Sequence, residues 1–135
     1  MAFLYFLPAN AEYSSDDLLR MTVESLSYDV GSDRAFVCGV GKISGNDPIG
    51  TYSARRTALT DAQRGLLILK RSIKEGRPPK IQNVSGFVPP LKILSEKIMN
   101  GLYFIEAEVS LSELMNLEDR EPKIDRIFHG TEYEF

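Results

Sequence analysis

The chain is poor in the residues that build disulfides and metal sites. Among its 135 residues there is one cysteine, Cys38, and one histidine, His129. A single cysteine excludes an internal disulfide and any multi-cysteine metal cluster. One histidine offers no pair for zinc and no local partner for a Cys–His dyad. The sequence therefore predicts no metal site and no cofactor, and we do not expect an enzyme.

Long apolar runs and an excess of positive charge are also missing. No segment approaches the roughly eighteen apolar residues of a membrane helix, and the net charge of −3 argues against a nucleic-acid partner. Apolar residues make up 43% of the chain and charged residues 26%, which is ordinary for a globular protein. A chain of this length is most simply one domain, and we expect no transmembrane segment.

The first eleven residues, MAFLYFLPANA, leave two interpretations open. A secretory signal needs a basic start, roughly 7–15 apolar residues and a small-x-small cleavage site. Residues 9–11 supply the cleavage pattern, but no Lys or Arg precedes Arg20, and the apolar run of residues 2–7 is short. From these residues alone, the segment is either what remains of an export signal or an ordinary first strand.

An amphipathic helix over residues 51–75 is the clearest local prediction. Apolar or small side chains recur there at steps of three and four, which places them on one helix face: Ala54, Ala58, Ala62, Leu66, Leu69 and Ile73. Thr51 or Ser53 can cap the start, and Gly76 can end the helix. We expect the small residues on this face, with Gly65, to let the helix backbone approach a sheet closely.

The remaining pattern predicts a mainly antiparallel sheet of about four strands. Residues 34–43 and 80–88 favour strands, and residues 91–99 and 102–111 flank Asn100-Gly101, the strongest two-residue hairpin signal. The last strand alternates, so one of its faces should be buried and the other wet. The buried set is Tyr103, Ile105, Ala107 and Val109; the wet set is Phe104, Glu106, Glu108 and Ser110.

This order, β-α-β-β-β, predicts an α+β two-layer domain in which one long amphipathic helix packs on the sheet. Short helices are also expected after Ser15 and after Ser110, each serine acting as an N-cap. We expect a single α+β domain over residues 12–118. Residues 1–11 would be the signal remnant, and residues 119–135 a polar acidic tail.

Several of these segments resemble the Lpp-twenty lipoprotein family, which includes the amino-terminal domain of flagellar assembly protein T. The resemblance rests on a Gly-x-Gly strand (Gly39 to Gly41), on a helix with Ala at four-residue spacing and an Asp-Ala-x-Arg step (residues 61–64), and on the strand that begins at Gly101. It covers roughly residues 34–111. These motifs consist of small and apolar residues.

The resemblance implies an exported cell-envelope protein with a non-catalytic assembly role, near the flagellar basal body or the outer membrane. It therefore favours the export-signal interpretation of residues 1–11 and a periplasmic or secreted protein. Many relatives carry a lipid on a cysteine at the cleavage site, whereas position 12 here is Glu. A lipid anchor is therefore not expected.

Three local patterns could suggest chemistry, and each has a structural explanation that we prefer. Cys38 lies within a strand, where a thiolate lacks a cationic or helix-terminal setting. Gly39-Val40-Gly41 has Ser44 where a dinucleotide loop needs its third glycine, so these are strand glycines under a closely packed helix. Glu106 and Glu108 are expected to be solubilising charges on the wet face.

The outer side of the long helix is the predicted interaction surface. On a helical wheel Leu67 points away from the apolar face and lies among basic residues, so it could anchor a partner with a charged rim. The set is Arg64, Leu67, Lys70, Arg71 and Lys74. We expect an envelope or flagellar protein, or a second copy of the chain, to dock there. The alternative is a periplasmic module that binds a small ligand on the sheet face left open by the helix.

Overall fold

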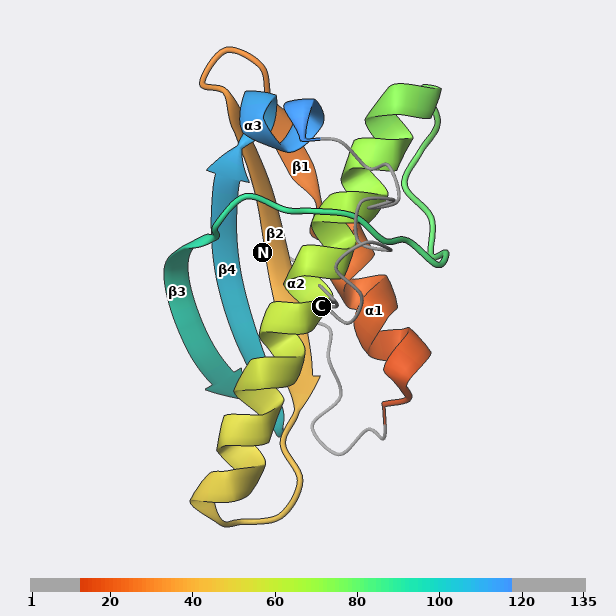
Figure 1. Ribbon diagram of the computed structural model, residues 1–135. Helices are drawn as coiled ribbons and strands as arrows, with labels where there is room; N and C mark the ends of the chain where they lie inside the picture. The colour runs from red at the N-terminus through yellow and green to blue at the C-terminus, as the bar shows by residue number, and fades with distance from the viewer. Residues whose placement is uncertain (1–12, 118–135) are drawn as a thin grey trace, which may run out of the picture.

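The structure, a computed structural model, describes residues 13–117, which form an α+β domain as the sequence predicts (Figure 1). The elements follow the order α1 (Ser15–Glu24), β1 (Ser27–Asp29), β2 (Arg34–Lys42), α2 (Pro48–Glu75), β3 (Lys92–Met99), β4 (Leu102–Ser110) and α3 (Leu111–Asn116). The four strands form one sheet in the order β1-β2-β4-β3, and every neighbouring pair is antiparallel. The export-signal remnant and the acidic tail lie outside the described residues.

Local sequence signals fix most of the element ends. Asn100 and Gly101 have φ angles of 53° and 77°, as a two-residue hairpin between β3 and β4 requires. Gly76 ends α2 in the left-handed conformation, and the Ser110 side chain caps α3, as expected. Two expected caps were wrong. Ser14 caps α1 in a reciprocal pair with Asp17, and Asp47 caps α2, which begins at Pro48.

The strand expected over residues 80–88 does not form. Its apolar residues do not alternate with period two, and Gly86 has a φ of 145°, a backbone conformation that strands do not use. Instead the segment 77–91 runs back across the side of α2 that faces away from the sheet (Figure 1). The fourth strand is β1, whose three residues are too short to show an alternation.

Helix α2 approaches the sheet closely because glycines and alanines meet at the contact. A Cβ atom on Gly39 would lie 1.9 Å from the Ala58 carbonyl oxygen, and one on Gly41 would lie 2.0 Å from that of Ala54. Ala58 and Ala62 are fully buried. The prediction that small helix residues press against strand glycines is therefore confirmed. The larger side chains of this core lie toward the other end of α2, around Leu66 and Leu69.

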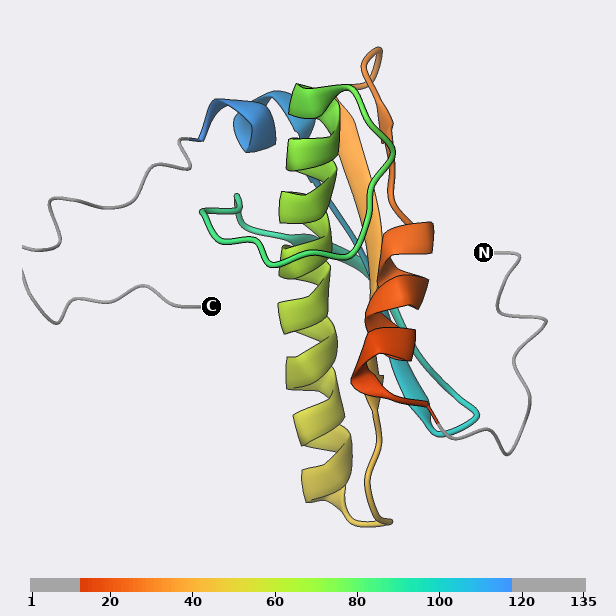
Figure 2. The same cartoon turned by 90° about the vertical axis from the view of Figure 1, so that its right-hand side faces the viewer.

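Helix α1 lies beside the edge of β2 and contacts both α2 and the opposite side of the sheet, here called the far face (Figure 2). Thr22 packs against Gly65 of α2. Leu18 and Met21 form a second apolar cluster with far-face side chains, among them Phe104, which is 2% exposed. The expectation of one wet face on β4 is therefore wrong at Phe104, because α1 covers that part of the sheet. It is also wrong at Glu108, which is buried.

None of the helices within residues 13–117 combines the length and the apolar character needed to cross a membrane.

Candidate docking site

The predicted interaction surface on α2 does not form as expected. Arg64, Arg71 and Lys74 are exposed, but Leu67 is only 5% exposed and Lys70 only 1%. The Lys70 ammonium group donates a hydrogen bond to the carbonyl oxygen of Leu117, just after α3. The apolar anchor that a partner would need is thus not available on this surface.

The helical wheel failed here because it considered only the helix and the sheet. The segment 77–91 returns across the outer side of α2, and Arg71 Nη1 donates a 3.0 Å hydrogen bond to Gln82 Oε1 of that segment. The end of α3 reaches the same side of α2 through Leu117. The outer side of the second half of α2 is therefore partly covered: Leu67 and Lys70 are buried there, while Arg64, Arg71 and Lys74 stay exposed.

The Asp-Ala-x-Arg step of α2 has a structural explanation. Asp61 is buried and lies 3.4 Å from Arg64 Nη1. Burial raises the pKa of the Asp61 carboxyl group, and the Arg64 guanidinium opposes part of that shift. Ala62, the residue between them in the step, packs against the sheet. These contacts explain the motif structurally, without a catalytic or binding role for its residues.

Cys38 is a core residue, as the sequence predicts. Its side chain belongs to the cluster with Leu18 and Met21 on the far face. Burial, and to a smaller extent the nearby Glu106 carboxylate, raises the pKa of the Cys38 thiol to about 12. The thiol is therefore unsuited to act as a nucleophile near neutral pH.

We expect the folded protein to resist alkylation by iodoacetamide at pH 8. With a pKa of about 12, only roughly one thiol in ten thousand would be ionised. Unfolding in guanidinium should expose Cys38 and give complete single labelling, which mass spectrometry measures. Labelling of the native protein at the rate of the unfolded chain would contradict the burial of this residue.

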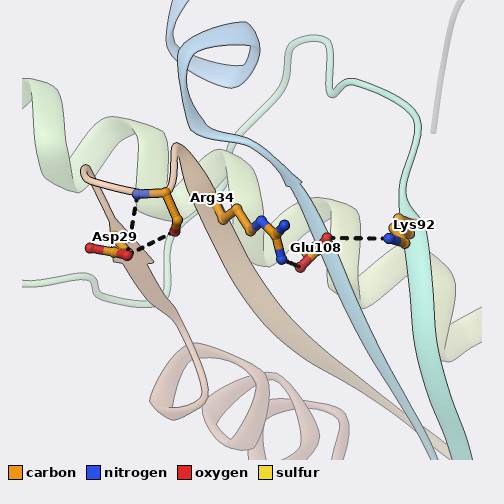
Figure 3. A network of polar contacts seen from close by, with 5 residues as sticks. Asp29, Arg34, Lys92 and Glu108 are labelled. Carbon is orange, nitrogen blue, oxygen red and sulfur yellow. Dashed lines mark hydrogen bonds and ion pairs between the residues drawn. The ribbon is translucent and has the colours of Figure 1, made fainter.

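The part of the far face that α1 leaves uncovered carries a row of charged side chains. Glu108 lies between Arg34, 3.3 Å away on β2, and Lys92, 3.9 Å away on β3 (Figure 3). Asp29 binds Ser32 in the neighbouring turn. Since the Glu108 carboxylate already has both cations beside it, no observation favours the small-ligand alternative, which stays a prediction.

One side of the sheet is closed by the chain itself. Strand β1 pairs with only the first three residues of β2, Arg34 to Phe36. Beyond it, the Ser25 hydroxyl oxygen accepts a 2.8 Å hydrogen bond from the Cys38 amide and so takes the place of a strand at this edge. Helix α1 packs along the same stretch of β2. These devices satisfy backbone groups that would otherwise be open to another strand.

The other side of the sheet, the β3 edge (Lys92–Met99), is not closed in this way. Within residues 13–117, β3 pairs only with β4, through seven of its eight residues, and the register shifts between Ile93 and Ser95. Its apolar side chains are unusually accessible: Ile93 is 37% exposed, Leu94 48% and Ile98 60%. A long edge with exposed apolar residues is a template for an added strand.

The charges on the β3 edge divide by sheet face. On the α2 side, Arg55 Nε donates a 2.9 Å hydrogen bond to Glu96, and the Tyr103 hydroxyl group also donates to this carboxylate. These hydrogen bonds, that of Arg55 first, lower the pKa of Glu96. The far face of the edge carries Lys92 and Lys97, both exposed. Glu96 is thus paired with Arg55 and Lys92 lies 3.9 Å from Glu108, so Lys97 is the cation that the β3 edge offers to an acidic partner.

Residues 13–117 therefore form an α+β domain in which β3 lies at one edge of the sheet and pairs on one side only. The described part of the chain holds no group of three or more His, Cys, Asp and Glu side chains arranged for a metal ion. Comparison with known proteins adds no relative, because no family model, no curated protein and no solved structure matches the chain. The Lpp-twenty resemblance therefore stays a prediction.

Sequence reasoning placed a strand at residues 91–99 but missed its role. The segment KILSEKIM carries no mark that distinguishes an edge strand from a central one, except the two lysines typical of exposed edges. Which strand lies at the edge depends on the sheet order, and β4, although last in sequence, inserts between β2 and β3. The edge is thus a property of the tertiary fold.

Proposed function

We propose that the chain is a non-catalytic assembly domain of a bacterial cell envelope, acting through protein contacts made by the β3 edge. The observation that carries the proposal is this eight-residue edge strand with its three exposed apolar side chains. The opposite edge of the same sheet is covered by Ser25 and α1. Strand addition to a free sheet edge is a common mode of protein recognition. The flagellar or outer-membrane setting and the export of the chain rest on the Lpp-twenty resemblance and on residues 1–11.

Cross-linking inside cells tests the docking part of the proposal. A photoreactive amino acid at position 98 should give a defined product of higher mass, because Ile98 lies on the β3 edge. The control is position 30, where Val30 is also exposed but sits in the turn between β1 and β2. Equal products from both positions, or none from position 98, would contradict docking at β3.

The cellular location is tested separately. Fractionation should find the protein in the envelope, and amino-terminal sequencing of the mature chain should begin at or near Glu12. A cytoplasmic protein that retains Met1 would remove the envelope part of the proposal. Docking at the β3 edge would be unaffected by that result.

A further inference from the structure

We infer that the occupant of the β3 edge is a second copy of this chain, which adds its residues 131–135 as a fifth strand. This inference deepens the proposed function and rests on it. Residues 131–135 lie outside the described part of the chain. Their sequence, TEYEF, combines two acidic side chains with two aromatic ones.

The sequence TEYEF is suited to a strand in an exposed sheet. Glu132 and Glu134 alternate with Thr131, Tyr133 and Phe135, so a strand would carry its acids on one face and its other side chains on the opposite face. Threonine, tyrosine and phenylalanine all favour strands. Such a segment cannot bury its aromatic side chains alone, whereas an edge strand offers both hydrogen-bonding groups and apolar neighbours.

The faces of the β3 edge match this alternation. Lys97 pairs with Phe104 and so lies on the far face, while Ile98 pairs with Tyr103 on the α2 side. An added antiparallel strand with Glu134 opposite Lys97 places Tyr133 opposite Ile98. The acid then meets a lysine, and an aromatic ring meets an exposed isoleucine, both favourable cross-strand pairs.

The charge of the β3 edge also favours an acidic segment such as residues 131–135. Glu96 is bound by Arg55, and Glu108 lies between Arg34 and Lys92, so the exposed Lys97 is the cation of the β3 edge that an acidic segment would meet. Residues 131–135 carry two acidic side chains, Glu132 and Glu134, and no basic one. An acidic segment is therefore steered toward the β3 edge, and added salt should weaken the contact.

Disulfide trapping between two different chains tests the proposed register. One copy carries Ile98→Cys and the other, enlarged by a tag, carries Tyr133→Cys; the native Cys38 is buried in both. Mild oxidation should link the two chains, whereas Val30→Cys paired with Tyr133→Cys should not. A link that forms only within a chain carrying both changes, at high dilution, would place the segment on its own copy and overturn the inference.

Charge reversal measures the contact without relying on a cross-link. Sedimentation at low salt should show self-association that Lys97→Glu weakens by about tenfold. Adding Glu134→Lys to the same chain should restore it. Because Lys97 is exposed, the fold should tolerate the reversal.

Two results would overturn the inference. A chain lacking residues 131–135 that associates as strongly as the full chain would show that another contact joins the copies. A full chain that stays monomeric at high concentration and low salt would exclude the second copy. In that case a cross-linked product from position 98 that contains a different protein would leave the proposed function standing. The inference and the proposed function can therefore fail separately.

Discussion

Gly39→Ala is expected to lower the free energy of unfolding by about 3 kcal/mol, one of the two largest single-residue effects we expect. The added Cβ would lie 1.9 Å from the Ala58 carbonyl oxygen and 3.0 Å from the Ala62 Cβ. A backbone oxygen in a helix cannot step aside as a side chain can, so α2 must shift along most of its contact with β2. Chemical denaturation with a two-state fit gives the free energy, and the melting temperature should fall by about 10 °C or more.

Gly31→Ala is the matched control, because it makes the same chemical change in the turn between β1 and β2, away from α2. A Cβ at position 31 would meet only Asp29 Oδ1, at 3.7 Å, which is an ordinary contact. Its effect should stay within about 0.5 kcal/mol. If Gly39→Ala were as mild as this control, the close approach of α2 to β2 would be wrong.

Phe104→Ala is expected to cost about 3–5 kcal/mol, as for other buried aromatic residues. Phe104 is enclosed by the cluster that α1 contributes on the far face, with Leu18 and Met21. Removing its ring leaves a cavity between α1 and the sheet. The loss should be accompanied by faster hydrogen exchange in α1, because this helix is held to the sheet partly by that cluster.

Ile98→Ala on the neighbouring strand is the control for this second prediction. Ile98 is exposed, so its loss should change the free energy of unfolding by less than about 1 kcal/mol. Equal effects of the two substitutions would mean that the far face is solvated, as the alternation in β4 alone suggested. The control also serves the docking proposal, because it should alter the β3 edge without unfolding the protein.

The sequence predicted those parts of the fold that depend on neighbouring residues. The Asn100-Gly101 turn, the Gly76 end of α2, the Ser110 cap and the glycines of β2 all act through backbone conformation or through a Cβ that is missing. The start of α2 could also have been predicted, since Asp47 followed by Pro48 is a cap with proline at the first helical position. Thr51 and Ser53 are capping residues too, which led to the wrong start.

Burial on the outer surfaces could not be predicted because it depends on what returns to cover them. Leu67 and Phe104 each lie on a face that their own helix or strand assigns to solvent, and each is buried in the structure. For Phe104 the cover is α1, which precedes the sheet in sequence. For the outer side of α2, the segment 77–91 and the end of α3 return across it, although neither has a periodic pattern that shows where it packs.

The sequence by itself determined the class of the fold, the long helix, the hairpin and the core position of Cys38, because local propensity and periodicity suffice for each. The tertiary structure alone decided which strands lie at the edges of the sheet and which side chains are covered. The order β1-β2-β4-β3 places β3 at an edge and lets Ser25 and α1 close the other side. Strand order depends on pairing between strands that are far apart in sequence. The pattern within a single strand therefore does not predict which strand will lie beside it.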